Sequence, residues 1–197
     1  MKLVLASKNQ HKLVEMQTIL GALGLEVVLE SEVGVDVDVE ETGVTFAENA
    51  MLKAKAVMEA SGLPAIADDS GLVVDALDGA PGVYSARYGN KNSDQERTAY
   101  LLENMADIPA EKRTARFVSA IACALPDGRT VTAEGRCEGT VTFAVKGENG
   151  FGYDPVFYSP ELGKTFAEAT ASEKNAISHR GRALKEFLSA WKEAGLC

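Results

Sequence analysis

Residues 1–13 read MKLVLASKNQHKL, and this stretch decides the class of fold. Lys2–Ala6 is a continuous apolar run after its first residue, typical of a strand buried on both faces of a sheet. A polar loop, Ser7–Gln10, follows. Apolar residues then recur at helical spacing, at Leu13, Met16, Leu20 and Leu23. Gly24 can end this helix, so the chain begins with a buried strand, a loop and an amphipathic helix.

Strands and helices continue to alternate along the rest of the chain. Thr45 and Glu48 form a capping box that predicts the start of a second helix. Helices are expected from there to about Ser61–Gly62, from Asp94 to about Met105, and along the apolar stripe Ile177, Leu184, Phe187, Leu188 and Trp191. Strands are expected at 26–31, 64–67 and 72–77, with a hairpin of 113–125 and 130–142 around a DG turn. Residues 78–90 and most of 146–158 are expected to be loops. This pattern predicts an α/β fold with a mixed sheet.

Composition limits the classes of function. The chain has 197 residues and a net charge of −9, without a basic patch, so we expect no nucleic-acid partner. Its length suits a single domain, 1–197, or two closely joined lobes. No apolar run reaches the roughly 18–20 residues that span a bilayer, and we expect no membrane partner. Without an export signal, the protein is expected in the cytoplasm with Cys123, Cys137 and Cys197 reduced.

The segment SKNQHK, Ser7–Lys12, lies between the first strand and the first helix. Free backbone N–H groups at a helix start bind anions, usually phosphate. Ser7 and Asn9 can add hydrogen bonds, and Lys8 and Lys12 add positive charge. Cations at a helix N-terminus oppose the macrodipole, which favours an arriving anion. The alternative interpretation is an ordinary N-cap with solvated lysines.

Lys53 is expected on or beside the inward face of the second helix. A lysine near a buried face extends its ammonium to solvent, pairs with an acid or meets a ligand, and all three remain open. Asn49, one turn earlier, could share its role. The inward stripe itself is expected at Phe46, Ala50, Ala54 and Val57.

Four carboxylates could serve a metal. Asp68 and Asp69 follow the short strand 64–67, where α/β folds place their sites. Successive strand side chains point to opposite faces, so the two acids need not serve one ligand. With Glu40 and Glu41 they offer the hard oxygen ligands that suit Mg²⁺ bound together with substrate phosphates. The alternative is an Asx turn at DDSG.

The motifs GFGYDP and EKNAISHRG could recognise a nucleotide. Phe151 and Tyr153 offer aromatic faces to a nucleobase, and Asp154 offers an acceptor. Lys174 could meet a phosphate.

The end of the second motif carries hydrogen-bond donors. His179 and Arg180 can donate to the carbonyl of a 6-oxo purine, whereas adenine presents a donor of its own. The alternative is a cap or packed role for His179 and a solvated helix position for Arg180. Taken together, these groups match a magnesium-bound purine nucleoside triphosphate.

The sequence resembles the inosine/xanthosine triphosphate pyrophosphatases, nucleotide house-cleaning enzymes. The matching motifs run in order over nearly the whole chain: SKNQHK, EETGVTFAENAMLKA, ADDSGLVVDALDGAPGVYSARY, GFGYDPVF and EKNAISHRG. The resemblance implies hydrolysis of ITP, dITP and XTP to the monophosphate and pyrophosphate with Mg²⁺. It also implies an elongated two-lobed α/β fold, with mixed sheet and flanking helices, an active-site cleft between the lobes, and a homodimer.

The resemblance also implies roles for individual residues. Asp69 looks like the catalytic carboxylate and a metal ligand, and Glu40 or Glu41 shares the metal. Phosphate-binding positions are Ser7, Lys8, Asn9, Gln10, His11, Lys12 and Lys53. Further substrate contacts are Ser70, Phe151, Gly152, Tyr153, Asp154, Lys174, His179 and Arg180. Asp68, also on the substrate side, is expected to be a supporting acid that holds Lys53 or the first-loop lysines. The expected reaction is attack of water on the α-phosphorus, with Asp69 accepting its proton directly or while holding Mg²⁺.

Three other interpretations are possible. A signalling receiver domain also carries an acidic pair after a buried strand, but it would leave SKNQHK and GFGYDP unexplained. A nucleotide sensor would bind without turnover. A pyrophosphatase of similar fold could act on dTTP or UTP instead.

Overall fold

The structure, a computed structural model, describes residues 1–196, except for the side chain of Leu23. Two positions used in the sequence analysis, Cys197 and the Leu23 side chain, therefore lie outside the described residues. Within 1–196, no helix is both long enough and apolar enough to cross a membrane.

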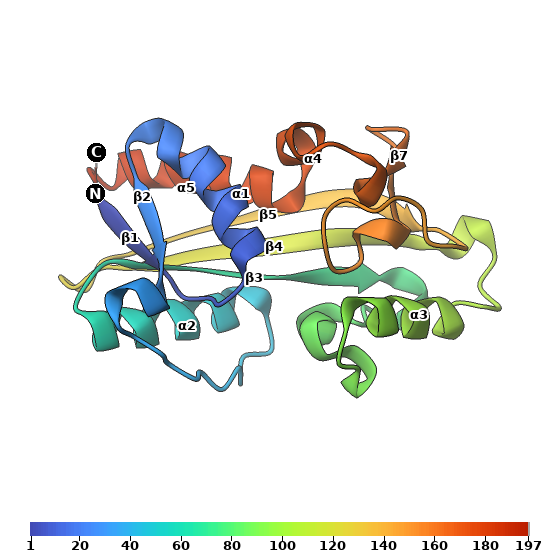
Figure 1. Ribbon diagram of the computed structural model, residues 1–197, viewed down its shortest axis with the longest axis horizontal. Coiled ribbons are helices and arrows are strands. Elements are labelled where there is room, and N and C mark those ends of the chain that lie inside the picture. The colour runs from blue at the N-terminus through green and yellow to red at the C-terminus, as the bar shows by residue number, and fades with distance from the viewer. Residues whose placement is uncertain (197) are drawn as a thin grey trace. The chain divides into compact units, whose positions relative to one another are not determined.

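A seven-stranded mixed sheet organises the fold (Figure 1). The strand order is β2-β1-β3-β4-β5-β6-β7. The strands are β1 Lys2–Leu5, β2 Glu26–Leu29, β3 Ala65–Val74, β4 Thr114–Ala124, β5 Thr130–Val141, β6 Phe157–Ser159 and β7 Lys164–Thr165. β1 runs parallel to β2 and β3, whereas β6 runs antiparallel to β5 and β7. The predicted mixed α/β sheet is confirmed.

Five α-helices accompany these strands in the described chain. They are α1 Gln10–Leu20, α2 Phe46–Ser61, α3 Asp94–Asn104, α4 Ala171–Ile177 and α5 His179–Glu193. The predicted capping box starts α2, where the Thr45 hydroxyl accepts from the Glu48 N–H and the Glu48 carboxylate accepts from the Thr45 N–H. Gly62 ends α2 with φ 68°, a left-handed conformation that favours glycine. The second helix was therefore predicted to within a residue.

The chain forms two compact units. Unit 1 comprises Met1–Asp69, Ser119–Gly135 and Arg180–Cys197, and unit 2 comprises Ser70–Val118 and Arg136–His179.

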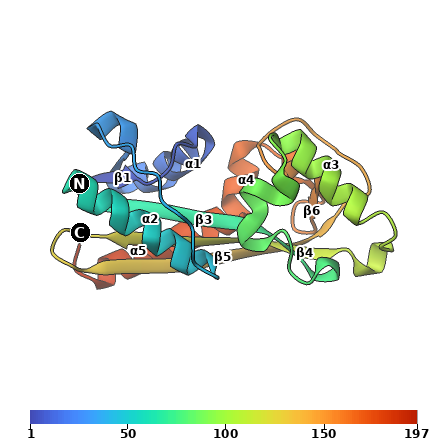
Figure 2. The same cartoon turned by 90° about the horizontal axis from the view of Figure 1, so that it is seen from below.

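Unit 1 has an apolar layer on each face of its strands. Leu3 and Leu5 of β1 point into the layer covered by α1 and α5, together with Trp191. Val4, between them, points to the opposite layer, where α2 contributes Ala50, Ala54 and Val57. Figure 1 shows α1 and α5 on one side of the strands and α2 on the other, and in Figure 2, seen from below, α2 lies in front of the strands. A strand buried on both faces explains the continuous apolar run at the start of the chain.

Unit 2 is built around one aromatic cluster. Phe117 of β4, Phe157 of β6 and Phe166 pack together, with ring centroids 4.6–5.6 Å apart. Leu101 of α3 is buried in the same cluster. The cluster gives unit 2 a core of its own.

The largest departure from the sequence prediction is β3. We predicted a strand at 64–67, a turn at DDSG and a second strand at 72–77, but one strand runs from Ala65 to Val74. Asp68 and Asp69 therefore lie inside a strand, and the Asx-turn alternative is wrong. In an Asx turn the carboxylates of Asp68 and Asp69 would bond to the backbone nearby. Here side chains distant in sequence supply their hydrogen bonds, and the chain stays extended.

Smaller corrections concern element ends. The single C-terminal helix predicted through Ile177 is wrong, because the extended Ser178 (ψ 159°) separates α4 from α5. The strand predicted at 26–31 ends at Leu29, where a 3₁₀ turn begins. The first helix passes into a 3₁₀ turn at Gly21 before Gly24 ends it. Residues 82–90 of the predicted loop also form 3₁₀ turns.

Candidate active site

The carboxylate of Asp68 lies at the centre of a buried charge network in unit 1. One of its oxygens, Oδ2, accepts from Arg180 Nε at 2.9 Å and Nη2 at 2.8 Å, and pairs with Lys12 Nζ at 3.2 Å. The other, Oδ1, accepts from the Ser119 hydroxyl at 2.7 Å. Arg180 also donates to Glu15 through Nη1. A charge this deep needs such partners, because desolvation otherwise disfavours it.

Asp69 has different surroundings, as the alternation of strand side chains predicts. Its Oδ1 accepts from Lys53 Nζ at 2.7 Å, and the same ammonium pairs with Glu41 at 3.1 Å. Asp69 Oδ2 is buried and has no hydrogen-bond partner among residues 1–196. Buried carboxylate oxygens are normally satisfied, so this one is open to a ligand.

The ionisation of Asp69 reflects this setting. Burial raises the pKa of Asp69 above its ordinary range, the Lys53 ammonium acts in the opposite direction, and Glu41 adds to the rise. Burial would lower the pKa of Lys53, but Asp69 and Glu41 outweigh it and the net shift is upward. Lys53 therefore stays protonated between two carboxylates.

Burial has the larger effect on Lys12. It lowers the pKa of Lys12, and the nearby cations Arg180 and Lys53 lower it further, although Asp68 opposes both. An ammonium in this environment gains from any additional anion that approaches it.

The loop before α1 and the first turn of the helix supply a cap and two lysines with different partners. The Asn9 side chain accepts from the N–H groups of His11 (2.9 Å) and Lys12 (3.4 Å), and the Ser7 hydroxyl accepts from the Asn9 N–H (3.1 Å). Gln10 and His11 are exposed in the first turn.

The capping interpretation is thus correct for Asn9, but the lysines are not simply solvated. Lys12 Nζ donates to the Asp68 carbonyl at 3.0 Å, and the exposed Lys8 pairs with Asp36 at 2.5 Å. Lys53 Nζ lies 3.4 Å from that same Asp68 carbonyl.

The expectation that Asp68 holds lysines is confirmed for Lys12 and corrected for Lys53. The Lys53 ammonium pairs with the carboxylate of Asp69 and contacts Asp68 only through its backbone carbonyl. The residue one turn earlier, Asn49, does not share the role of Lys53. Its buried amide bonds both backbone groups of Gly43, at 2.8 and 3.3 Å, and so closes the loop before α2.

Unit 2 holds a second buried ion pair. Lys174 Nζ donates to Asp154 Oδ2 at 2.7 Å, and the same oxygen accepts from the Phe151 N–H at 3.1 Å. The ammonium also lies 4.8 Å from the centroid of the Phe151 ring, which is half-buried. Gly152, with φ 60°, donates its N–H to Asp94 at 2.9 Å. These contacts fix the loop GFGYDP to α3 and α4.

His179 stacks on the aromatic cluster of unit 2. Its ring lies 4.6 Å from that of Phe117 at an angle of 15°, and it is buried. Tyr153 was expected to offer its face to a base, and this is wrong. Its ring is buried in the core of unit 2 and its hydroxyl donates to the Ser85 carbonyl at 2.6 Å. Burial raises the pKa of Tyr153, so it remains a neutral donor.

Two residues of the charge network were not identified from the sequence. Glu15, the sixth residue of α1, was overlooked. Ser119 is the only polar residue of the apolar run FVSAIACAL. That isolation was an available signal, because a hydroxyl buried among apolar residues needs a partner. Arg180 was predicted as a donor to a base, but its guanidinium lies against Asp68 and Glu15. Ser70 is half-buried in β3, at the start of its unit 2 portion.

The residues present fit a magnesium ion. Asp69 offers an orphaned buried oxygen, and Glu41 shares Lys53 with it, whereas Glu40 is exposed. No group of three or more His, Cys, Asp or Glu is placed to hold a metal within residues 1–196. Mg²⁺ commonly binds through one or two carboxylates and substrate phosphates, so this donor set suits it when substrate is present.

Comparison with known proteins supports the family resemblance that the motifs indicated. The sequence model of the Ham1 family matches residues 3–190. The chain is 52% identical over 191 residues to the dITP/XTP pyrophosphatase of Exiguobacterium sibiricum, with 96% of each chain covered. It is 51% identical over 193 residues to the dITP/XTP pyrophosphatase of Thermus thermophilus, covering 98% of this chain and 93% of the relative.

Solved structures show the same likeness. The structure of a HAM1 protein from Coxiella burnetii matches with a TM-score of 0.88 at 44% identity, covering 98% of this chain and 99% of the other. These matches confirm the resemblance inferred from the motifs.

Proposed function

This chain belongs to the Ham1 family, and on that premise we propose that it hydrolyses dITP, XTP and ITP to the nucleoside monophosphate and pyrophosphate. The observation that carries the proposal is the orphaned Asp69 oxygen, buried beside the Lys53–Glu41 pair. A carboxylate with one oxygen fixed by a lysine and the other open can act on a ligand without losing its own position.

Lys12 and Lys53 are the proposed phosphate ligands, with the Ser7–Lys12 loop. Both ammonium groups are mostly buried, with 15% of each side chain exposed, and both lie at the Asp68 carbonyl. Their positive charge would stabilise the phosphoryl oxygens and the leaving pyrophosphate as negative charge develops there. Lys8, exposed and paired with Asp36, would reach phosphate only by leaving that acid.

Asp69 and Glu41 are the proposed magnesium ligands. Asp69 keeps one buried oxygen without a partner in the described chain, and Glu41 contacts the same Lys53 ammonium, so the two carboxylates lie close enough to serve one cation. Bound there, Mg²⁺ would supply Lewis-acid stabilisation of phosphate charge.

Asp69 Oδ2 is the proposed acceptor of a proton from the attacking water. Lys53 holds the other oxygen and keeps the carboxylate oriented while the water attacks the α-phosphorus.

For the residues of unit 2 we propose recognition of the base. His179 is a donor suited to a 6-oxo group, and Phe151 offers a half-buried aromatic face. Lys174 is paired with Asp154, which makes its proposed contact with phosphate conditional on leaving that acid. A homodimer in the cytoplasm remains part of the proposal by resemblance to the family.

The test is a panel of nucleoside triphosphates. The purified protein is incubated with ITP, dITP, XTP, ATP, GTP, dTTP and UTP in Mg²⁺, and monophosphate and pyrophosphate are measured. We expect ITP, dITP and XTP, whose bases are deaminated 6-oxo purines, to yield both products with the highest kcat/KM of the panel. Release of orthophosphate, or a preference for dTTP or UTP, contradicts the proposal. Binding without turnover would support a sensor, and a stable acyl phosphate after incubation with a small phosphodonor would support a receiver domain.

A further inference from the structure

Ser119 is a buried hydroxyl in an apolar strand. It lies in β4 between Val118 and Ala120, and none of its surface is exposed. Its hydroxyl donates to Asp68 Oδ1 at 2.7 Å. A hydroxyl in such a position lowers stability unless it is bonded, so the Asp68 contact accounts for its presence.

The two oxygens of Asp68 have different partners. Oδ1 contacts Ser119, whereas Oδ2 contacts Arg180 and Lys12. The last torsion of an aspartate is broad and roughly two-fold, so rotation of the carboxylate is weakly restricted by the side chain itself. The Ser119 hydrogen bond on Oδ1 and the Arg180 bonds on Oδ2 therefore fix the plane of the group together, and Ser119 is the partner that holds the oxygen opposite Lys12.

Lys12 depends on that direction. Its ammonium contacts Asp68 twice, at the backbone carbonyl (3.0 Å) and at Oδ2 (3.2 Å). The carbonyl is fixed by the backbone of β3, whereas the carboxylate is fixed only by its own partners. Loss of the Ser119 hydroxyl would remove one of the bonds that orient the carboxylate and so loosen one of the two contacts that hold the ammonium in place.

We propose that Ser119 is a positioning residue that acts through Asp68 to hold the Lys12 ammonium for a phosphate group. The inference rests on the proposed function, because phosphate is the ligand proposed for Lys12. Ser119 itself contacts no substrate. Asp69, on the other side of the strand, is paired with Lys53 and should keep this pair when Ser119 is changed.

A double-mutant cycle with inorganic tripolyphosphate tests this role. Binding in Mg²⁺ is measured by calorimetry for the wild type, S119A, K12M and S119A/K12M. We expect S119A to raise Kd roughly tenfold, which is the effect of losing one hydrogen bond to a charged group. In the K12M background, S119A should change Kd less than about twofold, because there is no ammonium left to position. Equal effects in both backgrounds, or an unchanged Kd in S119A, overturn the proposal.

Turnover separates this proposal from the proposed function. With a hydrolysed nucleotide, S119A should lower kcat/KM about tenfold in the wild-type background and less than about twofold in the K12M background, because the effect of Ser119 passes through Lys12. A wild type that binds tripolyphosphate but hydrolyses no nucleotide contradicts the proposed function and leaves the double-mutant cycle fully interpretable. A wild type that does not bind tripolyphosphate shows that Lys12 holds no phosphate, and then the role of Ser119 is wrong too.

The chain offers a matched control in unit 2. Ser159 is equally buried, and its hydroxyl has no hydrogen-bond partner among the described residues. S159A should therefore leave Kd unchanged, and a tenfold rise there would mean that loss of any buried hydroxyl disturbs binding. If S119A does not fold, S119C carries the same test, since its thiol is similar in size and a weaker donor. We expect a Kd above that of the wild type for S119C, and an equal Kd overturns the proposal.

Discussion

Asp68 and Asp69 are adjacent in sequence but differ in chemistry. The Asp68 carboxylate is surrounded by Ser119, Arg180 and Lys12, whereas Asp69 keeps one buried oxygen without a partner. The pleat of β3 separates them, because consecutive strand side chains point to opposite faces. One acid therefore holds the network together while the other can act on a ligand.

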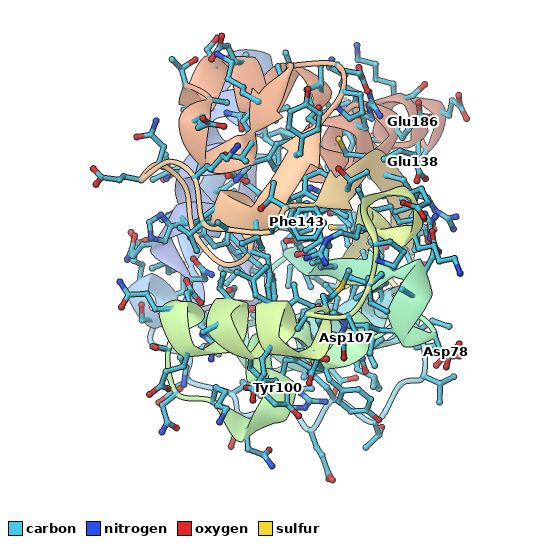
Figure 3. All side chains as sticks on the ribbon, turned by 90° about the vertical axis from the view of Figure 1, so that its right-hand side faces the viewer. Asp78, Tyr100, Asp107, Glu138, Phe143 and Glu186 are labelled. Carbon is cyan, nitrogen blue, oxygen red and sulfur yellow. The ribbon has the colours of Figure 1, made fainter. Side chains whose placement is uncertain are left out.

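The first prediction at this scale concerns Asp69. Asp69→Asn should lower kcat at least roughly a hundredfold, because an amide cannot accept the water proton. The fold should persist, since the amide oxygen can still accept from Lys53. Kinetics and circular dichroism measure the two effects. Asp107→Asn, at an exposed position of unit 2 labelled in Figure 3, serves as the control. Near-normal turnover in Asp69→Asn would remove Asp69 from the catalytic role.

A second prediction concerns His179. His179→Phe keeps an aromatic ring stacked on Phe117 but loses the donor. The ratio of kcat/KM for ITP to that for ATP should fall, because a donor matches the 6-oxo group and not the 6-amino group. The ratio cancels any general loss of activity, and His179→Ala should lower it as well. An unchanged ratio in both variants would show that His179 does not read the base.

A third prediction concerns the pH dependence of stability. Asp75 accepts from Arg116 at 2.9 and 3.0 Å and from Thr114 at 2.7 Å, and these bonds lower the pKa of Asp75. A depressed folded-state pKa stabilises the protein above the unfolded value, about 3.9, and this contribution is lost as pH falls through the folded value. Asp75→Asn should cost about 0.5–1 kcal/mol at pH 7, a value that allows for solvent screening. Urea unfolding from pH 7 to pH 2 should show the difference between the two proteins shrinking, and a constant difference would contradict the assignment.

At the scale of elements, Arg113 joins the ends of α3 and β5. Its guanidinium donates to the carbonyls of Met105, Ile108, Val141 and Thr142 at 2.7–3.0 Å. The Phe143 ring lies 4.1 Å from its central carbon and is labelled in Figure 3. Arg113 is buried, and burial lowers its pKa. One side chain thus satisfies four carbonyls at places where regular structure ends.

Arg113→Met should therefore destabilise the protein by about 3 kcal/mol or more, because the buried carbonyls lose their donors. Arg113→Lys should recover only part of this, since an ammonium cannot reproduce the fork of the guanidinium. Urea denaturation provides the free energies of unfolding. A loss below 1 kcal/mol in Arg113→Met would show that water replaces the guanidinium without cost.

The elements also differ in how far they were predictable. The helix α2 was predicted at both ends because its signals, the Thr45–Glu48 capping box and Gly62, act within a few residues. β3 was divided wrongly, because the DDSG segment has the local preferences of a turn. Its extended form depends on partners such as Ser85, whose hydroxyl accepts from the Leu72 N–H at 3.0 Å.

At the scale of the whole molecule, the two units share three strands. The unit boundaries at 69/70, 118/119 and 135/136 fall inside β3, β4 and β5. Unfolding one unit would leave the other with frayed strands whose hydrogen bonds and apolar faces are exposed. The chain should therefore unfold in one cooperative step.

Calorimetry checks this prediction, with a ratio of calorimetric to van't Hoff enthalpy near one as the expected result. Two resolved transitions would show that the units fold independently. The variant Arg113→Met, whose substitution lies in unit 2, should shift the single transition as a whole and leave no unit 1 transition at the wild-type temperature.

The sequence by itself determined the α/β class, the mixed sheet, the second helix and most of the charged residues of the candidate site. Those features depend on periodicity and on caps, which act over three or four positions. Only the tertiary structure decided which charges meet: Arg180 lies 112 residues from Asp68, and Ser119 lies 51 residues from it. Pairing over such separations follows from strand order and from which face each side chain occupies, and no local pattern encodes either. For that reason the acids could be found in the sequence, whereas the division of labour between Asp68 and Asp69 required the fold.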